Sequence, residues 1–422
     1  MKQTYRFARY LACAGLIAGT LSLWGCGSAS TYDPITPTRI VAFGDALVDV
    51  GQEGRLNAAA TKYRFTVNQV ETATTFNVGT TFIEAVASKF GFGTVSYALD
   101  NLTAGRLPST GAYSYGEFGA LVSGAAVFGA GTSEPADGTL QVADARGCQK
   151  KAGNKAARQV VVAPENIDER FCAYSLQAQI DLFLAQGSPS SNDLFVISIG
   201  TGDIMATGVR NLTIDATTPL TLAAGLDVVK AKLAADGVNT QLQAAANALA
   251  VQIKRLTDAG AKNVLVMGPP NVGRSPWAAT TGNATLFQNL SYNTGSGVIS
   301  MGSEGLARIQ ATFGNKTNNP VLFVETSGLV NTLTDPTNAS FANKTTSVCA
   351  ATAATLTTVT AKSIGIGIAA PGQLSAALCT TGTLGGDQST YVYADGVNFT
   401  TAMQSQFYNQ ALARMRLAAW IN

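Results

Sequence analysis

The sequence of 422 residues contains no histidine. Histidine is the side chain that most often transfers protons in catalysis and binds metals at neutral pH, so its absence excludes Ser-His and Cys-His catalysis and imidazole metal sites. Proton transfer would therefore depend on lysine or a carboxylate. The chain also lacks a close Cys-x-x-Cys pair, which argues against a zinc site. We expect neither a metal nor a cofactor.

Charged side chains are scarce, at 13% of the chain. Residues 1–25, which have the features of an export signal, carry three basic residues and no acidic residue. Without them, the 28 Lys and Arg fall to 25, against 26 Asp and Glu. No basic run exceeds two residues, so the sequence argues against a surface that follows nucleic-acid phosphates, and no nucleic-acid partner is expected.

Residues 1–25 are predicted to be a lipoprotein signal peptide. Lys2, Arg6 and Arg9 give the segment a basic start, and residues 11–24 form an apolar run that is rich in Ala, Gly and Leu. No later segment sustains the roughly 18 apolar residues that a transmembrane helix requires.

Residues 23–26, Leu-Trp-Gly-Cys, resemble a bacterial lipobox, in which Cys26 is acylated and becomes the new N-terminus. Because Gly27 rather than aspartate follows, the resemblance implies retention in the outer membrane of a Gram-negative bacterium. The alternative is an ordinary signal peptide cleaved near residues 28–30, which would leave a periplasmic or secreted protein.

A polar segment with two prolines predicts a tether over residues 26–38. The remaining residues, 39–422, can bury a sizeable core and are predicted to form one domain with loop insertions. The insertions are expected where the chain is rich in Gly, Ala, Thr and Asn. These stretches are residues 129–166, 209–222 and 345–388.

Four cysteines remain once Cys26 and the cysteine of the apolar signal run are set aside. An even number of cysteines in an exported protein indicates disulfides. Four cysteines allow three pairings, and we favour the pairs that are nearest in sequence. These pairs are Cys148 with Cys172 and Cys349 with Cys379.

Three short apolar runs have the pattern of strands buried on both faces, as in a parallel sheet. They are residues 39–44, 193–200 and 263–268. Apolar residues at three-and-four spacing predict helices between and after these strands. The helices are expected at residues 81–90, 175–185, 233–259 and 401–420. Alternating strands and helices favour a three-layer α/β/α sandwich with a central parallel sheet, in which ligands bind at the carboxyl ends of the strands.

Five sequence blocks, taken together, resemble the GDSL (SGNH) esterase/lipase family. They are residues 44–49, 121–127, 199–204, 264–276 and 395–400. Each block alone is a weak signal, but five in the family's order are a strong one. The resemblance implies an SGNH-hydrolase fold and ester hydrolysis by an activated serine, a histidine base and donors that stabilise the oxyanion.

The chain departs from the family at the residues that break bonds. Ala46 stands where the nucleophilic serine would be, and Asn398 stands in the place of the histidine base. Gly202 replaces the asparagine that would stabilise the oxyanion. Removing triad members costs on the order of a million-fold in a serine protease, so we expect no comparable hydrolysis.

Other family residues are retained, namely Asp45, Gly124, Asp203 and Asp395. The resemblance implies that the backbone N–H groups of Ala46 and Gly124 still face the oxyanion position. The three aspartates are expected to accept hydrogen bonds from backbone at loop ends, and the alternative is a surviving role in proton transfer.

The sequence therefore predicts a catalytically inactive esterase/lipase homologue that binds an acyl ester, a lipid, an acetylated glycan or a protein partner. The alternative is an active ester hydrolase with a non-standard nucleophile, such as Ser123 or Thr201, and a carboxylate base. A third interpretation is a purely structural component of the cell envelope.

Overall fold

The computed structural model describes most of the predicted domain. The described residues are 34–51, 64–68, 79–103, 105–123, 174–205, 207, 238–280, 284–293, 299–314, 319–349, 376, 379–382 and 384–422. The signal peptide, Cys26, Gly124, Cys148, Cys172 and most of the predicted insertions lie outside these ranges. Across the described ranges, no helix is long and apolar enough to span a bilayer.

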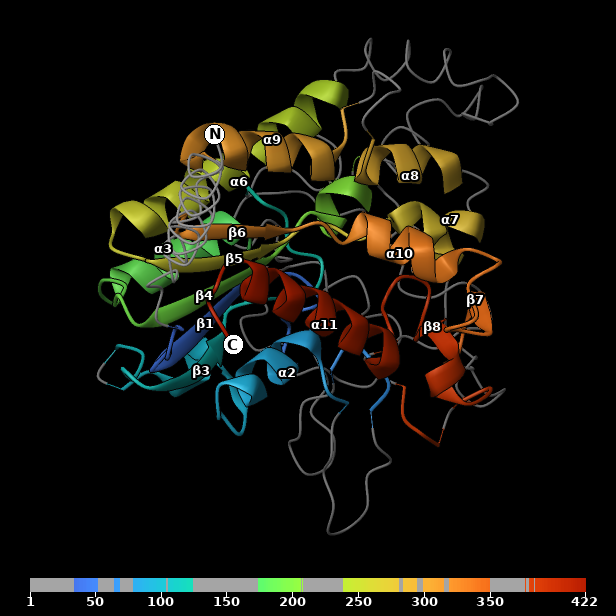
Figure 1. Cartoon of the computed structure of the whole chain (residues 1–422), viewed down its shortest axis with the longest axis horizontal. Coiled ribbons are helices and arrows are strands. Elements are labelled where there is room, and N and C mark those ends of the chain that lie inside the picture. The colour runs from blue at the N-terminus through green and yellow to red at the C-terminus, as the bar shows by residue number, and fades with distance from the viewer. Residues whose placement is uncertain are drawn as a thin grey trace, which may run out of the picture.

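Six parallel strands form the central sheet, in the order β2-β3-β1-β4-β5-β6 (Figure 1). They are β1 (Arg39–Gly44), β2 (Val95–Tyr97), β3 (Gly111–Ser114), β4 (Asp193–Ser198), β5 (Asn263–Met267) and β6 (Val321–Val324). The three predicted strands are β1, β4 and β5, which lie side by side at the centre and near one edge. The predicted α/β sandwich with a parallel sheet is confirmed.

The central strands are apolar along their whole length because both faces of the sheet are covered. In β1, Val41 and Phe43 belong to the core on one face, whereas Ile40 and Ala42 belong to the core on the other. All four side chains are buried. The same alternation continues in β4 and β5, so the sheet separates two hydrophobic cores.

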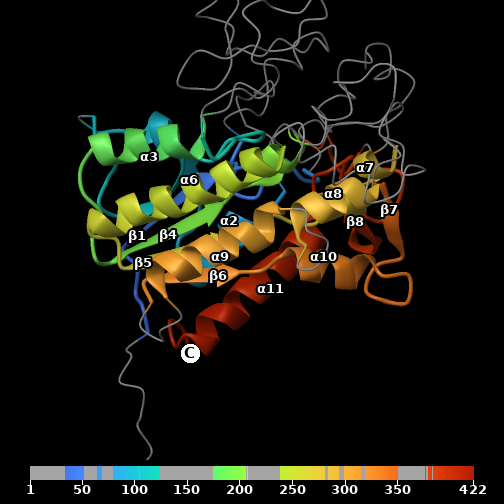
Figure 2. The ribbon, with the colours of Figure 1, turned by 90° about the horizontal axis from the view of Figure 1, so that it is seen from above.

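Helices form the outer layers (Figure 2). One face is covered by α3 (Leu176–Ala185), α6 (Val238–Asp258) and α9 (Met301–Phe313). The other face is covered by α2 (Phe82–Lys89), α10 (Ser327–Thr334) and α11 (Thr401–Leu417). The chain after β5 forms η5 (Val272–Arg274), α7 (Pro276–Thr280) and α8 (Ala284–Ser291). Beyond the carboxyl end of the main sheet, β7 (Asn343–Ser347) and β8 (Tyr391–Tyr393) form a small parallel sheet.

The helix boundaries follow the capping residues. Ser175 is the N-cap of α3, and its hydroxyl accepts a hydrogen bond from Ala178 N at 3.2 Å. The predicted last helix ends at Leu417 rather than Trp420, because the chain turns at Ala419 with φ of 56° and Trp420 N donates to Met415 O. This turn buries the side chain of Trp420.

Candidate functional site

The turn after β1 places Asp45 and Ala46 at the carboxyl edge of the sheet. Gly44, the last residue of β1, has φ of +131°, and a Cβ at this position would overlap the carbonyl oxygen of Ser198. Gln179 of α3 accepts a hydrogen bond from Gly44 N at 2.7 Å and donates one to Gly44 O at 3.0 Å. Only glycine fits this turn, and a buried amide fixes its peptide groups.

Asp45 joins the turn after β1 to the end of β4. Its carboxylate accepts hydrogen bonds from Ser198 Oγ at 3.2 Å and from Thr201 N at 3.4 Å, and its own N–H donates to Ser198 O at 2.7 Å. Burial raises the pKa of Asp45 to about 6, although hydrogen bonds from the side chains of Thr201 and Ser198 oppose this shift. The group therefore titrates close to neutral pH.

Two further buried aspartates hold the segment that follows β3. Asp203 accepts a hydrogen bond from Val122 N at 3.2 Å, and Asp49 accepts one from Phe118 N at 2.7 Å. Burial raises the pKa of each aspartate to about 7, and a neighbouring carboxylate adds to the shift. These bonds to backbone N–H groups support the structural role expected for the retained aspartates.

Neither Ala46 nor Gly202 supplies a side-chain donor or nucleophile. Ala46 places a methyl group at the turn, partly buried against the core. A Cβ on Gly202 would lie only 2.6 Å from Ala120 O and 3.1 Å from Gly119 O. An asparagine at position 202 would therefore force the backbone to move, because the path of the chain leaves no room for a side chain there.

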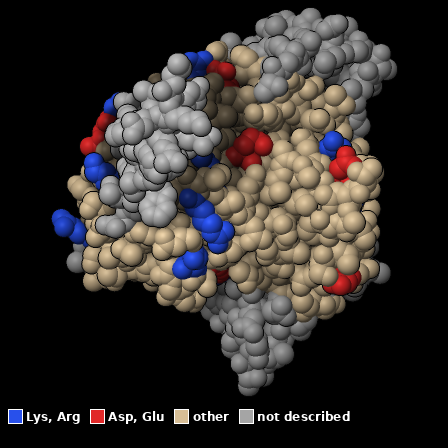
Figure 3. All heavy atoms as spheres, viewed as in Figure 1, with Lys and Arg blue, Asp and Glu red and all other residues tan. Residues whose placement is uncertain are grey.

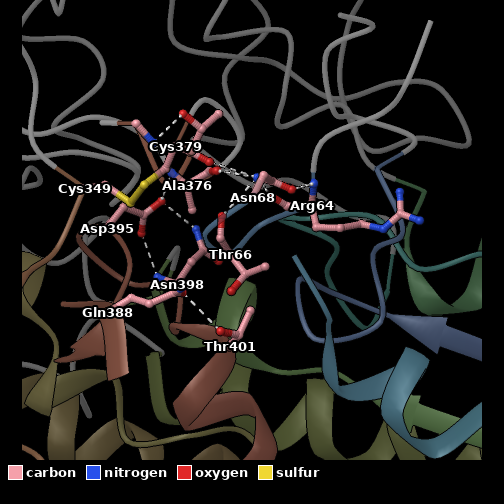
Figure 4. Close-up of a disulfide and its surroundings, with 12 residues drawn as sticks. Arg64, Thr66, Asn68, Cys349, Ala376, Cys379, Gln388, Asp395, Asn398 and Thr401 are labelled. Carbon is pink, nitrogen blue, oxygen red and sulfur yellow. Dashed lines mark hydrogen bonds between the residues drawn. A yellow bond between two sulfur atoms is a disulfide. The ribbon is translucent and has the colours of Figure 1, made fainter. Parts of the chain in front are cut away.

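The loop after β8 carries Asp395 and Asn398, which are both buried. One carboxylate oxygen of Asp395 accepts hydrogen bonds from Val397 N and Asn398 N, and the other accepts from Ala376 N and Asn398 Nδ2, all at 2.7–2.9 Å (Figure 4). Burial raises the pKa of Asp395, and these hydrogen bonds oppose the shift. Asn398 donates to this carboxylate, but its amide cannot accept a proton as an imidazole would.

A disulfide joins Cys349 to Cys379 beside this loop, which confirms one of the two predicted pairs (Figure 4). The segment that contains Cys379 contacts the loop through the bond from Ala376 N to Asp395. It also receives hydrogen bonds from Asn68 Nδ2, to Ala376 O at 3.3 Å and to Cys379 O at 3.1 Å. The crosslinked segment therefore connects the Asp395 loop to Asn68.

Removing this disulfide is expected to destabilise the protein by about 3–4 kcal/mol, because the crosslink closes a loop between residues 30 positions apart in the unfolded chain. The measurement is denaturant unfolding of a Cys349→Ala/Cys379→Ala variant. Alanine avoids placing a hydroxyl group in this buried site. A loss below about 1 kcal/mol would show that the crosslink contributes little, and wild-type protein unfolded in reducing buffer serves as the control.

Four predicted site residues come together at the carboxyl ends of β1 and β4. They are Asp45, Ala46, Gly202 and Asp203. The Asp395 loop is joined to the chain after β5 by a hydrogen bond from Trp277 N to Gly396 O at 2.9 Å. The predicted backbone donor at Gly124 lies outside the described residues.

Sequence reasoning missed two polar residues that organise the site. Gln179 lies on the buried face of α3 together with Leu176 and Ile180, so a polar residue at an apolar helix position was the available signal. Asn68 is buried and makes hydrogen bonds with both its side-chain atoms and its backbone. No pattern in the surrounding sequence marks it.

The site offers carboxyl groups with pKa values near neutrality, but Ala46 and Asn398 form no hydroxyl–base pair. In the part of the chain that the structure describes, no group of three or more His, Cys, Asp or Glu residues could hold a metal ion. Comparison with known proteins gives no match to this chain, either among protein-family models or among curated sequences.

Proposed function

We propose that the protein is a lipid-anchored cell-envelope protein of the GDSL/SGNH type that has lost triad hydrolysis and acts by binding. The hydrogen bond from Asn398 Nδ2 to Asp395 at 2.9 Å carries the proposal. It keeps the contact that would orient a histidine base, but it places there a group that cannot take a proton from a nucleophile. The ligand would be an acyl ester, a lipid, an acetylated glycan or a protein partner.

Two further observations support the loss of hydrolysis. The side chain of Ala46 has no hydroxyl group, and the space beside Gly202 is occupied by the carbonyl oxygen of Ala120. Loss of the triad residues costs on the order of a million-fold, and loss of one oxyanion donor costs about a further hundredfold to thousandfold. Binding requires none of these groups.

One observation favours the alternative of an active hydrolase. Thr201 is partly exposed, its side chain hydrogen bonds to Asp45, and the pKa of Asp45 is raised to about 6. A carboxylate with a pKa close to neutrality can serve as a general base for a neighbouring hydroxyl. Against this, Asp45 also accepts hydrogen bonds from Ser198 Oγ and Thr201 N, which fit a structural role.

The test is an esterase assay with short acyl esters on the chain from residue 28. Wild-type protein is expected to show no ester hydrolysis above background. An Ala46→Ser/Asn398→His variant is expected to hydrolyse esters at least roughly hundredfold faster than background, because it contains both a nucleophilic hydroxyl group and a histidine base. Gly202 is left unchanged, since a side chain there would displace the backbone. The matched control is Ala46→Ser/Asn398→Gln, which adds the hydroxyl without a base.

The outcomes separate the alternatives. Turnover by the wild type that disappears in Asp45→Asn and Thr201→Val would establish the alternative hydrolase. If the Ala46→Ser/Asn398→His variant did not hydrolyse esters, the proposal that the chain keeps the geometry of a GDSL/SGNH active site would be contradicted. Mass spectra of the purified wild type provide a second readout, because a bound acyl or glycan species supports binding, and an empty protein favours a purely structural role.

A further inference from the structure

The chain enters the domain at the amino edge of the central sheet. Ile35 N donates to Trp420 O at 2.8 Å, and Thr38 N donates to Asn192 O at 3.0 Å, just before β1 and β4 begin. Residues 35 and 38 of the predicted tether are thus held against the domain. The candidate site lies at the opposite, carboxyl edge of the same sheet (Figures 1 and 2).

Exposed cations gather at this amino edge. The helices run antiparallel to the strands, so their C-terminal ends lie here, where Lys89 ends α2 and Arg414 and Arg416 lie in the last turn of α11. Lys262 directly precedes β5. Figure 3 shows most of the Lys and Arg side chains in view on the left side of the molecule, which holds this edge.

Four of these cations form no ion pair with an acidic side chain among the described residues. Lys89, Lys262, Arg414 and Arg416 are exposed, and none of them forms an ion pair with any residue that the structure describes. Other cations on the helices are paired with acids. Near the end of α6, Lys254 pairs with Asp258 and Arg255 with Asp181, and within α9, Arg308 pairs with Glu304.

An exposed apolar side chain adjoins the two arginines at the end of α11. Leu417 is 80% exposed and follows Arg416 at the end of α11. The turn that follows brings Trp420 into contact with Ile35, so Leu417 lies close to the point where the chain enters the domain. Basic side chains next to an exposed leucine are the combination found on surfaces that contact anionic lipid.

The opposite edge has mixed charge. Asp45, Asp203 and Asp395 are buried there, and burial raises their pKa values. Asp335 and Asp387 are less buried, but the cations Lys344 and Arg274 lie near Asp335. A negatively charged surface would therefore attract the amino edge more strongly than the edge that carries the candidate site.

We propose that the amino edge, formed by Lys89, Lys262, Arg414, Arg416 and Leu417, rests against an anionic lipid surface, so that the candidate site points away from the membrane. The proposal rests on the lipid anchor at Cys26. Seven residues lie between Cys26 and Pro34. Fully extended, the eight Cα–Cα steps span at most about 30 Å, so an anchored chain keeps this edge near the bilayer.

The test uses the acylated protein, purified from membranes and reconstituted in vesicles of phosphatidylcholine with and without phosphatidylglycerol. Processing at Cys26 removes Trp24 and leaves Trp277 and Trp420. Quenching by brominated lipid is measured in Trp277→Phe, which reports Trp420, and in Trp420→Phe, which reports Trp277. In phosphatidylglycerol vesicles at low salt, Trp420 is expected to be quenched more strongly than Trp277.

Arg414→Gln/Arg416→Gln is expected to remove most of this difference. Each cation near an anionic surface contributes about fivefold to binding, so the pair contributes roughly 25-fold. The matched control is Ala339→Glu/Ser340→Glu, which makes the same charge change at exposed residues between α10 and β7 and is expected to change nothing.

Equal quenching of the two tryptophans, or an arginine variant that behaves like wild type, would overturn the orientation. A chain that remains in the soluble fraction of cells and carries no acyl group by mass would instead overturn the anchor on which the orientation rests. Loss of the quenching difference at high salt would support the electrostatic contact.

Discussion

Replacing Gly44 with alanine is expected to prevent the protein from folding. The residue has φ of +131°, and the added Cβ would overlap the carbonyl oxygen of Ser198 in the neighbouring strand. Relief would require β1 and β4 to separate, at the centre of the sheet and between two buried cores. We expect a loss above about 4–5 kcal/mol, the range of the most severe single substitutions.

Gly91→Ala is the matched control for this variant. Gly91 also has positive φ, at +83°, but a Cβ there would meet nothing within 4 Å. Its cost should therefore be limited to backbone strain, about 1–3 kcal/mol. Soluble yield and thermal unfolding followed by circular dichroism are the measurements. If the two alanine variants melted at similar temperatures, the close approach of Gly44 to Ser198 would not be essential.

Lowering the pH from about 8 to about 5 is expected to stabilise the protein. Burial raises the pKa of Asp45 to about 6, and of Asp49 and Asp203 to about 7, from 3.8 for the free groups. Between these values the folded protein binds more protons than the unfolded chain, so the free energy of unfolding falls as the pH rises. The contribution is complete below the unfolded pKa and is lost as the pH passes through about 6 and 7.

The expected effect is several kcal/mol, since each pKa unit corresponds to about 1.4 kcal/mol. Urea unfolding at about pH 8 and at about pH 5 measures the change in the free energy of unfolding. The Asp49→Asn variant should show a smaller change, because it lacks the contribution of Asp49. Hydrogen bonds lower the pKa of Asp335 and Asp387, which would act in the opposite sense, but these groups are exposed and screened by water. Higher stability at the higher pH would contradict the prediction.

The fold could be predicted from sequence where burial is complete. β1, β4 and β5 lie between two cores, so their apolar runs were visible. β2 and β3 have only three and four residues and include Ser96, Tyr113 and Ser114, so no apolar run marked them. β7, with the sequence Asn-Lys-Thr-Thr-Ser, is entirely polar and, among the described strands, pairs with the short β8 alone.

The sequence indicates which residue types occupy the candidate site, but it does not indicate how the backbone runs through the site. Ala46, Gly202 and Asn398 are the positions at which the sequence departs from the family that it resembles. Nothing in the sequence indicates that Gly202 lies against Ala120 O or that Gln179 holds Gly44, because these contacts join segments that are distant in the chain. The hydrogen bond from Asn398 to Asp395 is easier to predict from the sequence, since the two residues are only three positions apart.

The strand order also constrains when the protein can fold. Of the described strands, β1 comes first in the chain, yet its partner β4 lies about 150 residues later. Until β4 is available, the edge of β1 that pairs with it has no hydrogen-bonding partner, and Ile40 on one face and Phe43 on the other lack their neighbours in β4. The centre of the sheet therefore cannot form until nearly half of the chain, through Ser198, has been made, and the apolar strand β1 is prone to aggregation during that interval.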